Sequence, residues 1–217
     1  MYLPATFNET NVDVLRQLIQ AHPLGLLITH GASGLQASPL PFVCVSEPGR
    51  LRLRTHMARA NPHGDDLKAL NHCLVVFQGE QNYITPSWYP SKQSTHKVVP
   101  TWNYAMVQVQ GRPLLHEDAD WLHQQISQMT QHMEGQRPQP WAVSDAPEAF
   151  VASQMKAIVG IEIEVTEIKG KWKMSQNRSA EDAQGVVRGL SDAQDPHANV
   201  QVAQTVASSL MRQSSAL

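Results

Sequence analysis

The chain has 217 residues, of which 41% are hydrophobic and 17% are charged, and its formal net charge is -2. This composition is that of an ordinary globular protein and excludes a disordered chain, and no apolar run approaches the length of a membrane-spanning helix. The slightly negative charge argues against a general affinity for nucleic acid, which needs a strongly basic face.

The amino terminus carries acidic residues and no apolar stretch behind a basic leader, so it does not predict a signal peptide, and we expect a cytoplasmic protein without a membrane partner. The two cysteines, Cys44 and Cys73, lie in apolar strand-like runs. They are too few for a disulfide framework or a thiolate metal site, so we expect small buried side chains.

The first quarter of the chain predicts one helix and a β-meander. Apolar residues recur at helical spacing in residues 8–21, which predicts a short amphipathic helix. Three β-rich runs follow at 24–29, 35–46 and 50–56, separated by clusters of turn residues, which predicts antiparallel strands. The third run alternates leucine with arginine, so its guanidinium groups form a row on one face of the strand.

The middle of the chain predicts a short helix at 60–70 and two longer strands at 72–84 and 97–115, joined by a loop rich in Pro and Ser at 85–96. Residues 116–133 predict a surface helix with one buried apolar stripe. The stripe consists of Leu122, Ile126, Met129 and Met133.

The last third predicts a short helix at 147–157, a strand at 158–174 and two weak helices after Ser179, the second starting near Asp195. About six strands in a meander with peripheral helices predict a β-rich α+β fold, a small closed or split β-barrel. We expect this barrel domain to span 1–190 and a helical tail to span 191–217. The sequence has no glycine-rich nucleotide-binding motif.

Three segments without acidic residues carry cations beside hydroxyl, amide or aromatic side chains, at 48–64, 81–116 and 169–178. A phosphorylated planar ligand needs this mixture, because cations and N–H donors hold a phosphate while aromatic walls receive a ring. The alternative for each segment is a solvated strand face. The ten histidines show no ligand spacing for a metal, and no G-x-S-x-G motif supports a hydrolase.

Six short motifs together resemble one family, the PaiB-type FMN-binding negative transcriptional regulators. In chain order they are MYLPATF, LPF, HMARANP, YITPSWYPSK, KVVPTWNY and KWKMSQNR. The resemblance extends from Met1 to about Leu190. It implies a split β-barrel shared with pyridoxamine-phosphate oxidases and flavin reductases, and a homodimer that holds FMN in a groove between subunits.

The resemblance also implies a set of residues that contact FMN. Arg54, Thr55 and His56 would offer donors, Trp88 and Tyr89 would wall the ring, and Ser91 and Lys92 would reach the phosphate. The predicted set is Arg54, Thr55, His56, Asn61, Trp88, Tyr89, Ser91, Lys92, Trp102, Asn103, Gln176 and Arg178.

Two of these assignments leave alternatives open. Asn61 either contacts the ribityl hydroxyl groups or holds the turn before Pro62. Alternation places Trp102 and Tyr104 on one strand face and Asn103 on the other, so all three reach one flavin only if a dimer contributes both faces. We expect Gln176 and Arg178 to come from the partner subunit, and some of the aromatic residues to form an interface core.

The resemblance implies a transcriptional repressor, but the residues give little support for direct DNA binding, since the helix at 116–133 has no Lys or Arg. The alternative function is a flavin-dependent oxidoreductase, in which FMN carries the redox chemistry and the protein supplies placement and electrostatics. No residue pattern identifies its substrate or a catalytic side chain.

Overall fold

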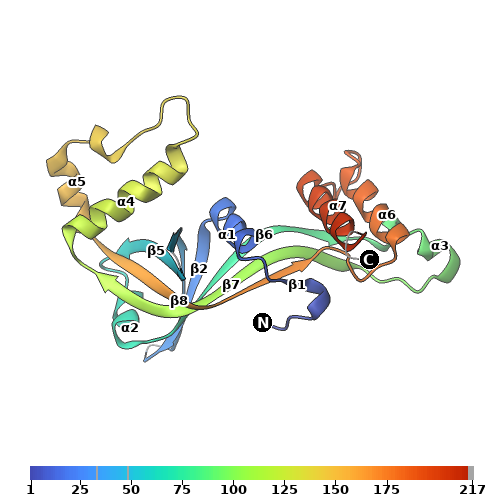
Figure 1. Cartoon of the computed structure of the whole chain (residues 1–217), viewed down its shortest axis with the longest axis horizontal. Helices are drawn as coiled ribbons and strands as arrows, with labels where there is room; N and C mark the ends of the chain where they lie inside the picture. Colours follow the sequence, from blue (N-terminus) through green and yellow to red (C-terminus); the bar gives the residue numbers. More distant parts are fainter. Residues whose placement is uncertain (33, 48, 215–217) are drawn as a thin grey trace. The chain divides into compact units, whose positions relative to one another are not determined.

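The computed structural model describes residues 1–32, 34–47 and 49–214 of the chain (Figure 1). Its strands are β1 (Asn8–Glu9), β2 (Leu24–Gly31), β3 (Gly34–Pro41), β4 (Val43–Glu47), β5 (Arg50–Ala58), β6 (Cys73–Ile84), β7 (Thr101–His116) and β8 (Ile158–Lys173). Its helices are α1 (Val12–Ala21), α2 (His63–Ala69), α3 (Ser91–Thr95), α4 (Ala119–Glu134), α5 (Glu148–Met155), α6 (Ala180–Ser191) and α7 (Val200–Ser214), with 3-10 turns η1 (Ala5–Phe7), η2 (Pro86–Trp88) and η3 (Val143–Asp145).

The described strands form one sheet in the order β3-β2-β6-β7-β8-β5-β4, and β1 pairs with β8. The pairs β2–β3, β2–β6, β4–β5, β5–β8 and β1–β8 are antiparallel. The predicted β-rich α+β architecture is therefore confirmed. The sheet has eight strands rather than six, because β1 was not predicted and the run at 35–46 is two strands.

The break between β3 and β4 falls at Phe42. Its backbone N–H donates to Pro23 O at 2.8 Å, and its ring packs edge-on against Phe77, with ring centroids 5.6 Å apart. Phe42 is only 2% exposed. The buried ring of Phe42 and its hydrogen bond to Pro23 thus mark the point at which the predicted single strand divides into β3 and β4.

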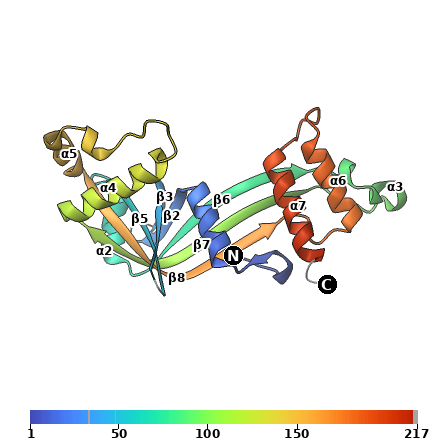
Figure 2. The same cartoon turned by 45° about the horizontal axis from the view of Figure 1, so that its top comes forward.

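The chain divides into two compact units. Unit 1 consists of residues 1–15, 78–107 and 169–217, and unit 2 of residues 16–77 and 108–168. β6, β7 and β8 contribute residues to both units. In unit 1, α6 and α7 pack against each other, as both views show (Figures 1 and 2). The predicted boundary at residue 190 stays a prediction, and the last three residues of the predicted tail lie outside the described part.

In unit 2, α4 packs on β4 and β5 and also contacts α5 and η3 (Figure 2). The predicted buried stripe of α4 holds at Leu122, which is 2% exposed, but fails at Met133, which is 48% exposed. The most buried position beside Leu122 is polar, Gln125. The stripe fails because only part of the helix rests on the sheet.

Candidate functional site

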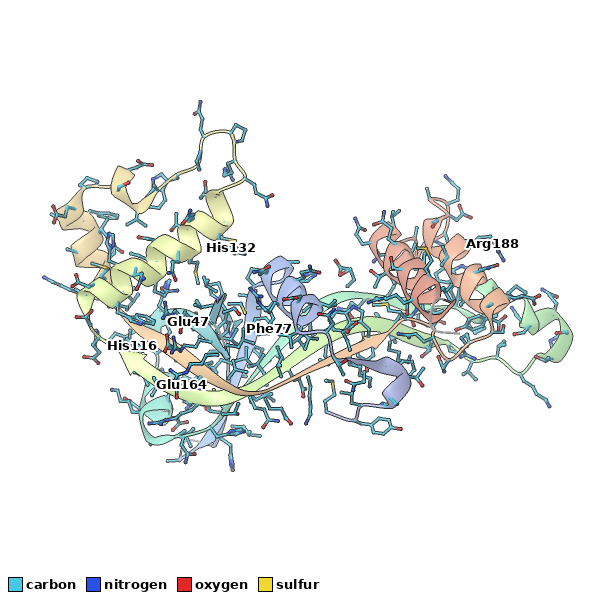
Figure 3. The ribbon with its side chains drawn as sticks, viewed as in Figure 1. Glu47, Phe77, His116, His132, Glu164 and Arg188 are labelled. Atoms are coloured by element: carbon cyan, nitrogen blue, oxygen red, sulfur yellow. The ribbon has the colours of Figure 1, made fainter. Side chains whose placement is uncertain are left out.

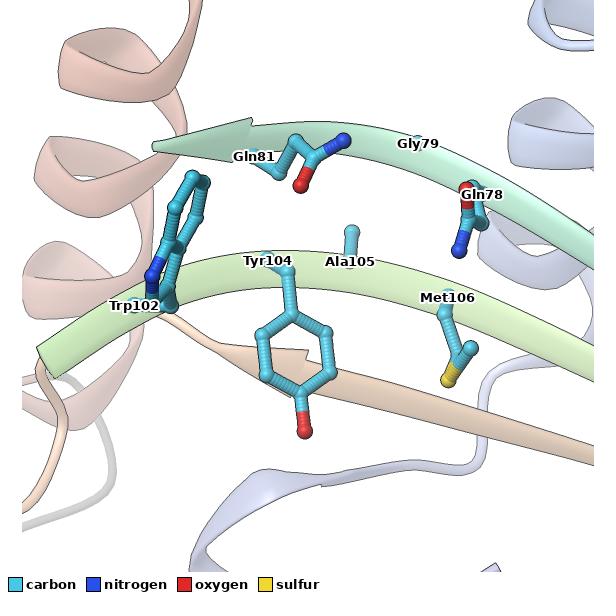
Figure 4. Close-up of a pocket in the computed structure, with 7 residues that line it drawn as sticks. All are labelled: Gln78, Gly79, Gln81, Trp102, Tyr104, Ala105 and Met106. Carbon is cyan, nitrogen blue, oxygen red and sulfur yellow. The ribbon is translucent and has the colours of Figure 1, made fainter. Parts of the chain in front are cut away.

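A groove of about 330 Å³ lies on the β6–β7 face of unit 1 (Figure 4). Its volume falls at the lower end of the range of small-molecule sites. It is lined by Gln78, Gly79, Gln81, Trp102, Tyr104, Ala105 and Met106. Figure 4 shows the amide side chains of Gln78 and Gln81 on β6 and the aromatic side chains of Trp102 and Tyr104 on β7, so the groove combines flat apolar surface with neutral hydrogen-bonding groups.

Strand alternation positions the aromatic side chains. Trp102 and Tyr104 project from one face of β7, whereas Asn103 and Val107 on the other face are 1% and 0% exposed. On β6, Gln78 and Gln81 line the groove on either side of Gly79, which lines it as well.

Trp102 is the exposed aromatic surface of the groove. Its ring is 51% exposed and meets Tyr83 edge-on, with centroids 6.4 Å apart. Tyr83 in turn packs against His197, 5.0 Å away. The indole is therefore oriented by a neighbour while its accessible surface stays available for a planar ligand.

Two lysines of β8 lie beside the groove. Lys171 is 9% exposed, donates to Tyr2 O at 3.1 Å and lies 5.4 Å from the ring centroid of Tyr104. Lys173 donates to Trp102 O and to Thr101 Oγ1. Burial lowers the pKa of Lys173, and the positive charges of Lys171 and Arg178 lower it further.

This arrangement fits an anion. An ammonium group has three N–H donors, and the third donor of Lys173 has no acceptor within hydrogen-bonding distance among the described residues. The charge of Lys173 is destabilised by the charges of Lys171 and Arg178, and a bound phosphate would stabilise it. The donor set and the aromatic surface therefore match a phosphorylated planar cofactor.

The aromatic residues predicted from the 85–96 loop have partners inside unit 1. Trp88 Nε1 donates to Asp195 Oδ2 at 2.9 Å, and Ser91 donates its backbone N–H and its hydroxyl to the two oxygens of Asp182, at 3.0 and 2.7 Å. Tyr89 is 2% exposed. These contacts fasten the loop to α6 and to the turn after it.

Lys92 differs from its neighbours. It is half-buried, and its Nζ lies 3.4 Å from Ser87 Oγ, the limit of a hydrogen bond. Its ammonium group is thus only weakly engaged by the described residues.

The remaining predicted residues of unit 1 are also tied locally. Asn103 Nδ2 donates to Ser175 Oγ at 2.9 Å, while its buried Oδ1 has no partner among the described residues. The Gln176 side chain bridges Trp172 O and Met174 N, both at 2.6 Å.

Arg178 lies over the ring of Tyr89, with Cζ 4.8 Å from its centroid. Burial raises the pKa of the Tyr89 hydroxyl, and the Arg178 guanidinium partly offsets that rise. Arg178 therefore contacts the loop that the motifs predict to be part of the flavin site.

Four predicted residues belong to unit 2. Arg54 pairs with Glu162 at 2.7 Å and lies over Trp121, which stacks on His116 with ring centroids 4.2 Å apart. Figure 3 marks His116 at the end of β7. The predicted arginine row is thus present, but its charge is compensated by glutamate.

Thr55 and His56 alternate on β5. Thr55 is fully buried and donates its hydroxyl to Pro41 O at 2.6 Å, while His56 Nδ1 lies 2.8 Å from Gln125 Oε1. Adjacent strand residues face opposite sides of the sheet, so these two side chains do not share one environment.

Asn61 makes a local hydrogen bond across Pro62. Its Oδ1 accepts the backbone N–H of His63 at 3.0 Å at the start of α2. His63 is 1% exposed and bonds Thr29 Oγ1 and Ser38 Oγ, both at 2.8 Å. Burial lowers the pKa of His63, and Asp66 partly opposes this shift.

Sequence reasoning missed Gln78, Gln81 and Met106 as lining residues. The signal for the two glutamines would have been polar residues that follow the apolar run of this strand.

Within the described ranges, no group of three or more His, Cys, Asp or Glu is arranged to hold a metal ion. No helix of the described part is long and apolar enough to cross a membrane. Cys73 is buried as predicted, which raises the pKa of its thiol to about 12, whereas Cys44 is only half-buried.

Residues 1–167 match the model of a protein family described as "Putative FMN-binding domain". The chain is 30% identical over 213 residues to protease synthase and sporulation protein PAI 2 of Bacillus subtilis, a match that covers 98% of this chain and 100% of that protein. It is 34% identical over 236 residues to an uncharacterized protein of Aspergillus fumigatus, covering 88% and 90% of the two chains.

The structure of an FAD and heme binding protein from Mycobacterium smegmatis has the same fold, with a TM-score of 0.56 and 14% identity over 76% of this chain and 73% of that one. This likeness confirms the predicted split β-barrel fold, and the family match confirms the predicted cofactor, FMN. The chain therefore belongs to the FMN-binding domain family, to which its six ordered motifs point.

Proposed function

We propose that this protein is a flavin-dependent oxidoreductase that holds FMN in the β6–β7 groove of unit 1. Trp102 and Tyr104 would receive the isoalloxazine ring, Gln78 and Gln81 its polar edge, and Lys173 the phosphate. When bound, FMN supplies hydride and single-electron transfer, and the protein supplies placement and electrostatics.

One observation carries this proposal. Lys173 is fixed to Trp102 O at the edge of the groove, keeps a free N–H and has its pKa lowered by burial and by two neighbouring cations. A phosphate would satisfy that donor and stabilise the charge of Lys173. The exposed Trp102 ring lies at the same end of the groove.

The other residues predicted to contact FMN fall into groups according to the hydrogen bonds and packing contacts that they already make. Trp88, Tyr89, Ser91 and Gln176 are engaged inside unit 1, and we propose that they hold the walls of the site rather than the cofactor. Lys92 and Arg178 remain candidates for the phosphate. A contact between FMN and Asn103, or FMN and Arg54, Thr55, His56 or Asn61, stays a prediction.

The experiment is reconstitution followed by anaerobic reduction. Purified protein is titrated with FMN while flavin fluorescence is recorded, and the loaded protein is then mixed with NADH or NADPH. We expect saturable binding and bleaching of the flavin absorbance. Failure to bind FMN overturns the site, whereas binding without reduction by either nucleotide overturns the oxidoreductase function alone.

The predicted role as a transcriptional repressor stays a prediction. The relative's name, protease synthase and sporulation protein, is compatible with it. However, α4 has no Lys or Arg, and α6 and α7 have one Arg each, so these helices lack a basic recognition face. Retention of a DNA fragment that survives moderate salt would favour the repressor over the enzyme.

We also propose a homodimer in the cytoplasm. Unit 2 has an apolar outer face made by three strands, on which Pro39, Leu26 and Val76 form one cross-strand row and Ala37, Ile28 and Leu74 the next. Leu24 and Leu35 at its ends are 65% and 78% exposed. Because neither row carries a charge, the face can pair with the same face of a second copy about a twofold axis.

A further inference from the structure

A second groove, of about 470 Å³, lies in unit 2 between α4, α5 and η3, at the ends of β5 and β8. Both ribbon views show α4 and α5 close together beside these strand ends (Figures 1 and 2). Its apolar walls are Ile126 and Met129 of α4, Phe150 and Met155 of α5, and Trp141 of the preceding loop. Trp141 and Phe150 are 49% and 57% exposed, so two aromatic rings flank its opening.

The polar groups of this groove are few and neutral. Among the described residues that line it, none is Asp, Glu, Lys or Arg, and the polar side chains are His56, Thr130 and Gln154. An apolar cavity with a few convergent polar groups is the usual form of a small-molecule site. The absence of a lining cation disfavours a carboxylate or a phosphate, which would lose its hydration without gaining a partner.

His56 lines the groove. Its Nδ1 lies 2.8 Å from Gln125 Oε1, and since a carbonyl oxygen only accepts, Nδ1 is the donor, which leaves Nε2 as the acceptor of the neutral ring. No described residue bonds Nε2. Gln125 is 1% exposed and its Nε2 has no partner among the described residues, so an unused donor lies on the side chain that orients the imidazole.

We propose that this groove binds an uncharged planar phenol, whose ring packs against the apolar walls and whose hydroxyl group donates to His56 Nε2. A hydrocarbon of the same shape would leave His56 Nε2 without a donor, and a carboxylate has no cation among the described lining residues. The groove shares no lining residue with the β6–β7 groove, and the proposal does not depend on the proposed function.

The test compares three naphthalenes of similar size by isothermal titration. 2-Naphthol has an uncharged donor at neutral pH, 2-methoxynaphthalene has none, and 2-naphthoate is charged. We expect 2-naphthol to bind roughly fivefold to tenfold tighter than 2-methoxynaphthalene, as for one added hydrogen bond, and 2-naphthoate to bind weakest. Equal binding of the first two, or tightest binding of 2-naphthoate, would overturn the proposal.

Variants locate the site. His56→Phe keeps an aromatic ring and removes the acceptor, so the preference for 2-naphthol should vanish. Met129→Ala should weaken 2-naphthol binding several-fold, whereas Met133→Ala, on the same helix outside the groove, should not change it. If His56→Phe fails to fold, the comparison of Met129→Ala with Met133→Ala still tests the site. Equal affinities of these two variants for 2-naphthol would place the ligand elsewhere and refute the proposal.

Discussion

Lys173 is the residue on which the proposed FMN site depends most directly. Its ammonium group donates to Thr101 Oγ1 and to Trp102 O, and its third N–H has no acceptor among the described residues. Lys173→Met should reduce FMN affinity roughly tenfold to a hundredfold, since a charge-assisted hydrogen bond contributes about 1.5–3 kcal/mol. Riboflavin, which lacks the phosphate, should lose little, and parallel fluorescence titrations measure both ligands.

Lys92→Met is the matched comparison. This lysine is half-buried in the loop that the motifs single out, and only a 3.4 Å contact with Ser87 engages it. A selective loss of FMN affinity in Lys92→Met and not in Lys173→Met would move the phosphate to the loop. An equal loss of FMN and riboflavin in either variant would indicate damaged packing.

His116 makes stability depend on pH. It stacks on Trp121 with an interplanar angle of 5°, and its buried Nε2 has no partner among the described residues. Burial lowers the pKa of His116, Arg54 lowers it further, and Glu162 and Asp118 partly oppose these effects. The unfolded chain, with an ordinary histidine pKa of about 6.5, therefore takes up a proton first as the pH falls.

The free energy of unfolding should consequently decrease as the pH falls below about 6.5, until the lowered folded-state pKa is passed. His116→Phe keeps the stack on Trp121 and should remove part of this decrease, while His63, whose pKa is also lowered, retains the rest. Urea denaturation at several pH values between 5 and 8 measures the slope. An identical pH slope in the variant and the wild type would contradict this account.

At the scale of elements, α6 depends on two glycines. A Cβ at Gly185 would lie 2.0 Å from Trp88 O, and one at Gly189 would lie 2.4 Å from the Trp88 ring. The helix thus approaches the loop more closely than any other residue would allow. This contact explains why Trp88 is packed on a helix rather than open to a ligand.

Gly189→Ala should therefore destabilise the protein by about 1–3 kcal/mol, as overpacking does, despite the better helix propensity of alanine. Gly64→Ala in α2 is the control, because its Cβ would meet nothing closer than the Met57 sulfur at 3.8 Å. That variant should be neutral or stabilised by up to about 1 kcal/mol. Thermal denaturation of both variants checks the difference, and equal stabilities would refute it.

Most elements could be predicted because their signals are local. Alternation gave β5 and β8, and helical spacing gave α1, with Leu15, Leu18 and Ile19 buried. The failures have long-range causes. Trp88 and Ser91 donate hydrogen bonds to Asp195 and Asp182, which lie about a hundred residues later in the chain. No local sequence pattern predicts these hydrogen bonds.

At the scale of the whole molecule, the motifs predicted the family and the cofactor, but the site followed only in part. Trp102 of the predicted set lines the groove, as does Tyr104, which was considered with it, and Lys173, which was noted only as part of a basic segment, lies beside it. Membership of a groove depends on which strands become neighbours, here β6, β7 and β8. The pairing of β6, β7 and β8 brings together segments that are far apart in the sequence, and the composition of the chain does not encode which strands pair.

The proposed dimer is tested by a charge on the outer face of unit 2. Leu26 is the centre of the row that joins β3, β2 and β6 and is 38% exposed, so Leu26→Lys should leave the fold of the subunit intact. In the dimer the ammonium group would be buried opposite its own copy without a partner, which costs several kcal/mol. We expect light scattering to give a dimer mass for the wild type and a monomer mass for Leu26→Lys at micromolar concentration. Met133→Lys, at an apolar position on α4 that is 48% exposed, should stay dimeric, and a Leu26→Lys protein that also stays dimeric would place the interface elsewhere.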